Sequence, residues 1–187
     1  MGVLLNDSLR HAALALGALA LASLIGMPLG LLAAARGWAR APILAAAAVG
    51  RTLPSIAVLA LLVPLLGVGA PPALAALTLL ALPPIVINID LALRSTPLSA
   101  LDVAAGLGMS STQRFARVVV PLALPVALAG VRTAGVEVIG SATLATFVGA
   151  GGLGDDIVRG LQTGDTTLLA LASAIVAAMA LAVEIRR

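Results

Sequence analysis

The sequence predicts an all-α integral membrane protein with five transmembrane helices, and three observations support this fold class. Of the 187 residues, 61% are hydrophobic and 10% are charged, whereas a water-soluble chain needs about a quarter of its residues charged. The apolar runs are continuous, while the strands of a membrane β-barrel alternate polar and apolar residues. At roughly 20 residues per span, the chain has room for about five or six helices.

Charged residues and runs of glycine and proline divide the chain into these spans. Pro28 is expected to kink the first span, which neighbouring helices tolerate inside a bundle. A glycine- and proline-rich segment, 67–72, separates the second span from the third. No second domain is visible, so residues 1–187 are expected to form one transmembrane domain. The spans are predicted at about 12–35, 43–66, 73–93, 127–148 and 166–183.

The basic residues predict the orientation in the membrane, because positive charge gathers on the cytoplasmic side. With the polar segment 95–121 inside, only Arg10 and Arg159 lie outside. The eight expected at the inner face are Arg36, Arg40, Arg51, Arg94, Arg114, Arg117, Arg186 and Arg187. Since an odd number of spans puts the termini on opposite sides, the N-terminus is expected outside and the C-terminus inside.

The composition excludes several classes of function. Cys is absent and His11 is the only histidine, so no clustered side chains suggest a metal or catalytic site. Lys is absent too, which excludes a phosphate-binding P-loop. The arginines are scattered between apolar runs, a pattern typical of membrane-flanking charges rather than of nucleic-acid binding. We therefore expect no catalytic, cofactor or metal site on this chain, and an energy source on another chain.

Three charged residues, Arg51, Arg132 and Glu137, fall inside predicted spans. Charges are costly in lipid and usually face a bundle interior or a cavity. Arg132 and Glu137 are separated by about 140° around a helix, so they do not share a face. Two interpretations remain open: the side chains reach the interface or pair with a neighbouring helix, or they lie on a transport path.

The polar segment 95–121 predicts a helix, a glycine turn and a second helix on the inner membrane face. Residues 101–107 can form a short helix with Asp102 near its start, where a carboxylate favours the helix dipole. Gly108 would end this helix in a left-handed cap.

The second short helix of this segment is expected to carry Arg114 and Arg117. Pro121 fits the first turn of a new segment, because proline is tolerated there. The residues that can cap the start of this helix are Ser110, Ser111 and Thr112.

The same segment resembles the EAA loop of ATP-binding-cassette (ABC) importer permeases. In that motif an acidic residue is followed by one residue, Ala, three residues and Gly, and then by nine residues before an aliphatic–x–aliphatic–Pro ending. Asp102 stands for the usual Glu and Val103 for the usual first Ala. The residues at the motif spacings are Asp102, Ala104, Gly108, Val118, Val120 and Pro121.

Further motifs extend the resemblance over about residues 12–187. They are similar to motifs in the permeases of osmoprotectant importers for glycine betaine, carnitine and choline. The methionine-importer permease shares the five-span core and a Gly-Gly-Leu-Gly loop, so an amino-acid importer is the alternative. A secondary transporter and a membrane scaffold are alternatives of another class. The motifs lie at 27–32, 52–57, 66–69, 82–84 and 149–155.

The resemblance implies a MetI-like fold, with short cytoplasmic coupling helices between the third and fourth spans. It also implies a non-catalytic permease subunit in a prokaryotic plasma membrane. The implied partners are an ABC ATPase dimer that holds ATP and Mg²⁺, a second permease copy or paralogue, an extracytoplasmic substrate-binding protein and the lipid bilayer. The residues assigned to the ATPase-coupling loop are Asp102, Ala104, Gly108, Arg114, Arg117 and Pro121.

The glycine-rich loop 149–154 is expected to form an ordered extracytoplasmic turn between the last two spans, with a flexible connector as the alternative. Its glycines suggest positive φ angles or close approach of another chain, and the candidate residues are Gly151, Gly152 and Gly154. The chain has only three aromatic residues, too few for the cation–π cage that quaternary ammonium groups prefer. Substrate selectivity is therefore expected to reside in the binding protein.

Overall fold

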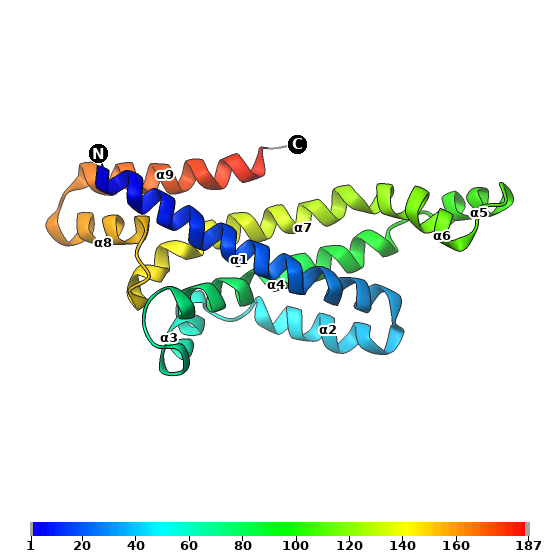
Figure 1. Cartoon of the computed structure of the whole chain (residues 1–187), viewed down its shortest axis with the longest axis horizontal. Helices are drawn as coiled ribbons and strands as arrows, with labels where there is room; N and C mark the ends of the chain where they lie inside the picture. The colour runs from blue at the N-terminus through cyan, green and yellow to red at the C-terminus, as the bar shows by residue number, and fades with distance from the viewer. Residues whose placement is uncertain (1, 186–187) are drawn as a thin grey trace.

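The computed structural model describes residues 2–185, which form an elongated bundle of helices joined by short turns (Figure 1). No strand occurs in that range. The long axis runs from the N-terminus and α8 at one end to α5 and α6 at the other. In chain order the elements are α1 (Gly2–Ala35), α2 (Gly37–Gly50), α3 (Ser55–Leu66), α4 (Ala70–Arg94), α5 (Leu98–Gly106), α6 (Ser111–Arg114), the π-helix η1 (Phe115–Val119), α7 (Val120–Ser141), the 3₁₀-helix η2 (Ala142–Val148), α8 (Leu153–Thr163) and α9 (Thr166–Glu184).

Among the described residues, four helical segments are long and apolar enough to cross a membrane, and the pair α2 and α3 makes a fifth if it is one broken span. The prediction of an all-helical membrane protein is therefore confirmed. The third and fifth spans agree closely with α4 and α9. The four segments are Val3–Ala35, Ala70–Arg94, Ser111–Val148 and Thr166–Glu184.

The prediction of one continuous second span at 43–66 is wrong. The axes of α2 and α3 are bent by 99° at the break between Gly50 and Ser55. Pro54 explains the break, because proline disfavours helical conformation in the residue before it and donates no backbone hydrogen bond. Arg51 therefore lies in the turn after α2, where its N–H donates to the Ala47 carbonyl, and not inside a membrane helix.

The second short helix of the polar segment, α6, continues without a break into the predicted fourth span. Residues Ser111–Val148 form one continuous helical path that includes the predicted fourth span. The π-helical turn η1 lets the path continue, with the N–H of Val120 donating to the carbonyl of Phe115. The wider turn accommodates the ring of Pro121, which would otherwise clash with the carbonyl of Arg117 one regular turn earlier.

Two further boundaries differ from the predictions. The helix of the first span begins at Gly2 rather than near residue 12 and remains helical through Pro28. The amphipathic helix α8 is not among the predicted elements, because residues 155–165 carry several charges and lack the apolar run that predicts a span. The end of the predicted cytoplasmic tail, Arg186 and Arg187, lies outside the described residues.

Small residues bring the helices close together around α4, which lies between α1 and α7. Gly130 of α7 faces α4, and a Cβ at that position would lie 2.8 Å from the Pro84 carbonyl oxygen. A Cβ at Gly26 of α1 would lie 3.0 Å from Ile85. Such close backbone approach is typical of helices packed inside a membrane.

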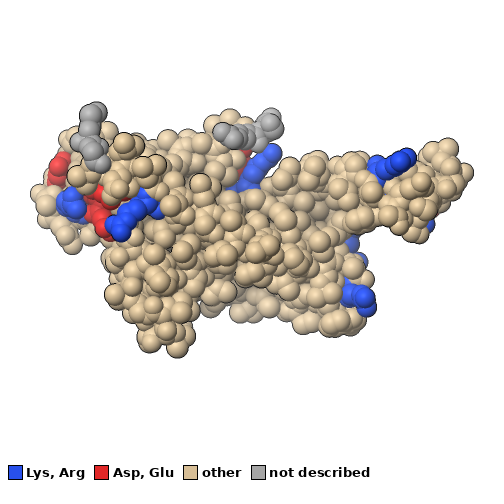
Figure 2. All heavy atoms as spheres, in the orientation of Figure 1, with Lys and Arg blue, Asp and Glu red and all other residues tan. Residues whose placement is uncertain are grey.

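Most charged side chains lie toward the two ends of the molecule, with a broad uncharged surface between them and a smaller charged group at the upper edge near the middle (Figure 2). One charged group covers the end formed by α8 and the start of α1, and another lies toward α5 and α6. This distribution matches a protein whose long axis crosses a bilayer, because charges at the bilayer centre are costly.

Candidate functional site

The end formed by residues 98–114, named the helical knob here, projects beyond the rest of the bundle (Figure 1). Its first helix, α5, ends in a Schellman motif, in which Met109 N–H donates to Ala104 O at 3.1 Å and Gly108 N–H donates to Ala105 O at 2.9 Å. Gly108 has a φ of +75°, as the sequence predicted for a left-handed cap. The turn is therefore set by backbone geometry.

The second half of the knob begins with a capping box. The hydroxyl of Ser110 accepts from the N–H of Gln113 at 3.3 Å, and the Gln113 side chain accepts from the Ser110 N–H at 2.9 Å. Arg114 ends α6, and Arg117 and Pro121 follow on the same helical path. Both halves of the knob thus have their ends capped locally.

Asp102 lies differently from the expectation, because α5 begins at Leu98 and no acidic residue occupies its first turn. The helix-dipole effect falls off within the first turn, so this argument for Asp102 is wrong. Its carboxylate is exposed, while Ala104 packs inward. Three large apolar side chains of the knob are strongly exposed, namely Leu98, Val103 and Leu107. The knob presents an apolar and acidic surface that the chain itself does not cover.

A buried carboxylate ties three helices together beside the knob. Asp90 of α4 is only 3% exposed and accepts hydrogen bonds from Arg40 of α2 at 3.1 and 3.2 Å. Arg94 donates to the same carboxylate at 3.2 Å and also to the carbonyl of Ala34, in the last turn of α1. A spacing of four residues on one helix is enough to suggest the Asp90–Arg94 pair, but nothing in the sequence indicates the link to α2.

Arg51 and Glu137 line one polar cavity of about 290 Å³ between the α2–α3 break, α4 and α7. The two side chains do not form an ion pair within 4.0 Å of each other in residues 2–185. Arg132 is half-buried and is not among the residues that line the cavity. The structure thus brings together two of the three charges expected inside spans and leaves the third apart. The remaining lining residues are Gly50, Leu53, Ser55, Leu80 and Ser141.

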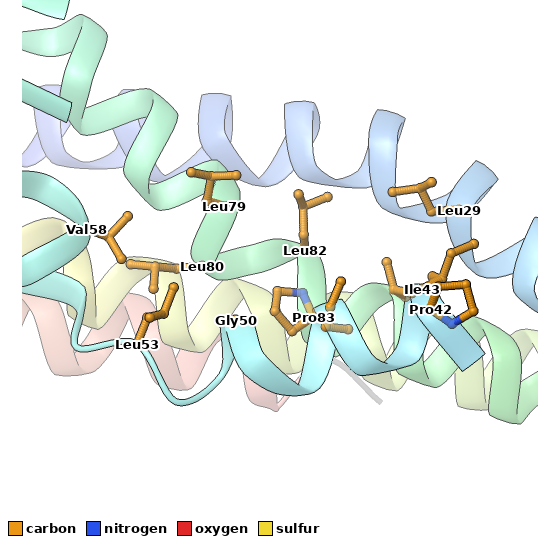
Figure 3. A pocket seen from close by; sticks show the side chains of 13 residues that line it. Leu29, Pro42, Ile43, Gly50, Leu53, Val58, Leu79, Leu80, Leu82 and Pro83 are labelled. Carbon is orange, nitrogen blue, oxygen red and sulfur yellow. The ribbon is translucent and has the colours of Figure 1, made fainter. Parts of the chain in front are cut away.

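An apolar cavity of about 460 Å³ adjoins the polar one (Figure 3). The two cavities share Gly50, Leu53 and Leu80. Side chains from α1, α2, α3 and α4 form its wall, with Pro42, Leu82 and Pro83 among those that point toward it. An apolar cavity therefore lies next to the polar cavity, on the side of the α2–α3 break.

The glycine-rich loop is an ordered turn that packs on α1. Gly151 and Gly152 have φ angles of +78° and +96°, and a Cβ at Gly152 would lie 3.3 Å from the Cα of His11. Gly154 lies directly against the backbone carbonyl of Thr143, so any side chain there would collide with it. The positive φ angles that the glycines suggested are present at Gly151 and Gly152, while the close approaches are made by α1 and η2 of the same chain.

The loop leads into α8, which buries a carboxylate against α1. Asp156 is 1% exposed and lies 3.7 Å from the guanidinium of Arg159. Burial raises the pKa of Asp156, the nearby charge of Asp7 on α1 raises it further, and Arg159 opposes these effects. His11, fully buried close by, contacts the carbonyl of Ile139 through Nε2 at 3.0 Å. This cluster could not be predicted from the sequence, because it joins α1 to a helix that was not expected.

We expect Asp156→Asn to raise the apparent Tm of the purified protein by a few degrees at pH 7.5 and to flatten its dependence on pH. Because the pKa of Asp156 is raised in the folded state, the folded protein binds its proton more tightly than the unfolded chain does. Stability from this group is therefore present below the ordinary aspartate pKa and is lost as the pH rises through the raised value. Thermal unfolding from about pH 4, near the ordinary aspartate pKa, up to about pH 8 measures the effect.

Asp155→Asn is the matched control for that experiment. Asp155 also lies in the first turn of α8 but is only half-buried. Both variants lose the same favourable position near the helix N-terminus, so the difference between them reports the burial of Asp156. Equal pH profiles for the two variants would contradict the prediction.

The chain is similar to known transport proteins over most of its length. The family described as "Binding-protein-dependent transport system inner membrane component" matches residues 26–185. The chain is 37% identical to the osmoprotectant import permease protein OsmW of Salmonella typhimurium, over 98% of this chain and 87% of the relative. It is 39% identical to the choline transport system permease protein OpuBB of Bacillus subtilis, over 86% and 74% of the two chains. The carnitine transport permease protein OpuCB of Listeria monocytogenes is 35% identical, over 97% and 83%.

Among solved structures, the chain is similar to an inward-facing conformation of the MetNI methionine ABC transporter. The TM-score is 0.84, and the match covers 98% of this chain and 92% of the other. At 22% sequence identity this likeness establishes the fold, and the predicted MetI-like architecture is confirmed.

Proposed function

Given that the chain belongs to the family of inner membrane components of binding-protein-dependent transport systems, as the permease subunit of an ABC importer, we propose that it imports quaternary-amine osmoprotectants such as glycine betaine, carnitine or choline. The observation that carries this proposal is identity of 35–39% with permeases named for those solutes, over most of each chain. The methionine-type alternative is supported by fold likeness alone. Membership of the family sets aside a secondary transporter or a scaffold.

The chain itself carries no chemistry in this proposal. ATP and Mg²⁺ are held by a separate ATPase dimer, and a second permease copy or paralogue completes the membrane part. An extracytoplasmic binding protein delivers the solute. The cavity lined by Arg51 and Glu137 is open at the surface of the single chain. Lipid at this opening would leave both charges unsolvated, which supports the presence of a second permease subunit or water there.

The helical knob is the proposed docking element for the ATPase. Asp102, Arg114 and Arg117 offer charges to it, while the exposed Leu98 and Leu107 offer apolar area. From the knob, the helical path Ser111–Val148 is 38 residues long and passes Glu137 before it reaches the glycine-rich loop. Movement of the knob by the ATPases would therefore shift the cavity and the opposite end together, toward the proposed binding-protein side at Gly151, Gly152 and Gly154.

The test of the proposed function is uptake by proteoliposomes that contain this permease with its own ATPase and binding protein. We expect uptake of labelled glycine betaine, carnitine or choline that requires both ATP and the binding protein. Unlabelled methionine should not compete. Uptake of methionine in place of the quaternary amines would overturn the osmoprotectant assignment and favour the amino-acid importer.

The orientation is tested by labelling single cysteines, since the native chain contains none. We propose that the knob is cytoplasmic and α8 extracytoplasmic, as the arginine distribution predicts. Ser111→Cys should then react with a membrane-impermeant reagent only after the cells are opened, while Thr163→Cys should react in intact cells. Both positions are exposed. Labelling of Ser111→Cys in intact cells would reverse the topology.

A further inference from the structure

The cavity lined by Arg51 and Glu137 has the composition of a site for a small solute rather than of a structural ion pair. Its volume of about 290 Å³ lies at the small end of the range of ligand pockets, about 300–1,000 Å³. Two opposite charges lie at its wall, and both Ser55 and Ser141 add hydroxyl groups. Leu53 and Leu80 supply the apolar part.

Both charged residues are exposed in the isolated chain, but they lie far along the membrane helices, where charge is costly in lipid, so their presence needs a reason. Arg51 follows the 14 residues of α2, which corresponds to about 21 Å of helix from the start of α2. Charged residues at such depth in membrane proteins usually pair with each other or mark a solute path. Arg51 and Glu137 are close enough to interact electrostatically, yet they do not close into an ion pair within the described residues.

Local structure keeps the two charges apart. The turn after α2 is held by the hydroxyl of Thr52, which donates to the Val49 carbonyl at 2.8 Å, and by Pro54 at the start of α3. Glu137 lies on α7, whose position against α4 is set by the close contact of Gly130 with Pro84 and Asn88. These contacts set where the two backbones lie, and the two charged side chains line one cavity without forming an ion pair in the described residues.

We propose that this cavity is a passage site for a zwitterionic solute, with the Arg51 guanidinium binding its carboxylate and the Glu137 carboxylate facing its quaternary ammonium group. The inference rests on the proposed osmoprotectant function and deepens it. A guanidinium binds carboxylates through two parallel hydrogen bonds. A quaternary ammonium group has no N–H to donate, so it interacts through charge with Glu137 and through its methyl groups with Leu53 and Leu80. The permease then adds a preference for carboxylated solutes to the selection made by the binding protein.

The test compares uptake of glycine betaine with uptake of choline, which carries the same ammonium group but no carboxylate. Arg51→Gln is expected to lower glycine betaine uptake about tenfold or more, the size of a lost charge-assisted hydrogen bond, and to leave choline uptake near wild type. Glu137→Gln is expected to lower both. All variants are reconstituted with the same ATPase and binding protein, so the preference of the binding protein cancels in the ratio.

Arg132→Gln is the matched control, because Arg132 is also an arginine that was expected inside a span, but it lies on α7 outside the cavity. Its ratio of glycine betaine to choline uptake should equal that of the wild type. If Arg51→Gln does not assemble, Arg51→Lys replaces it. Lysine keeps the charge without the planar fork, so glycine betaine uptake should still fall relative to choline.

An unchanged uptake ratio in the assembled Arg51 variant would overturn the passage site while leaving the proposed function intact. Equal loss of both solutes in that variant would also overturn it, because a general structural defect explains such a loss. Failure of the wild type to take up either solute with ATP and binding protein would instead overturn the proposed function, and the passage site with it.

Discussion

Gly108→Val is expected to abolish ATP-driven uptake by the assembled transporter, while the variant still inserts into the membrane. Gly108 has a φ of +75° and supplies the N–H that closes the Schellman motif of the knob. A residue with a Cβ pays about 1–2 kcal/mol in that conformation, and valine, which is branched at Cβ, fits it least well. Relief of the strain requires the turn to open, which changes the angle between α5 and the path that begins at Ser111.

Gly106→Val separates this effect from the addition of bulk. A Cβ at either glycine would meet nothing within 4 Å in this chain, but among the two only Gly108 has positive φ. Gly106 lies in the last turn of α5 and tolerates a side chain there. Both variants should therefore fold, and only Gly108→Val should lose coupling.

Three measurements decide the outcome for this pair of variants: co-purification of the ATPase, ATP hydrolysis stimulated by the loaded binding protein, and uptake. We expect Gly108→Val to show weakened ATPase binding, or hydrolysis without uptake. Wild-type values in all three measurements would show that the knob does not couple ATP hydrolysis to transport. Loss in both variants would assign the effect to a surface clash with the partner instead of to the turn.

Much of the fold could be predicted because its signals are local. The apolar runs predicted the ends of α4 and α9 to within three residues. The Gly108 cap depends on neighbouring residues, so the sequence indicated it, whereas the sequence left Ser110, Ser111 and Thr112 as alternative caps and the structure selects Ser110. The broken second span was missed because the apolar run continues through Pro54 while the backbone direction changes. A hydropathy pattern reports burial in lipid and says nothing about a bend.

The candidate site was harder to predict, because it depends on how helices are rotated and how deep they lie. Arg51 and Glu137 are far apart in the sequence, and their common cavity arises only from the 99° bend and the packing of α7 on α4. The same holds for Arg40 and Asp90, which are separated by 50 residues. Within one helix, by contrast, a spacing of four residues was enough to indicate the Asp90–Arg94 pair.

Asp90→Asn is expected to lower the thermal stability of the protein strongly. Loss of the contact with Arg40 should contribute more to this effect than loss of the contact with Arg94. Asp90 is buried and accepts from both arginines, so the loss of its charge leaves two guanidinium groups facing a neutral side chain. Removal of one partner of a buried pair costs about 3–5 kcal/mol, and the 44% exposure of each arginine side chain puts this case toward the lower end.

The two arginines differ in what they connect. Arg40 joins α2 to α4, whereas Arg94 pairs with Asp90 within α4, and a pair four residues apart on one helix contributes about 0.3–0.5 kcal/mol. In double-mutant cycles read by thermal unfolding, Asp90→Asn with Arg40→Gln should therefore show a larger interaction energy than Asp90→Asn with Arg94→Gln. Interaction energies between residues in one network range from about 0.5 to 3 kcal/mol.

Because Asp90 lies two turns before the knob begins at Leu98, the weaker α2–α4 contact should also reduce the fraction of ATP hydrolysis that drives uptake. Additive effects in the Arg40 cycle, or tight coupling in Asp90→Asn, would contradict this role for the buried carboxylate.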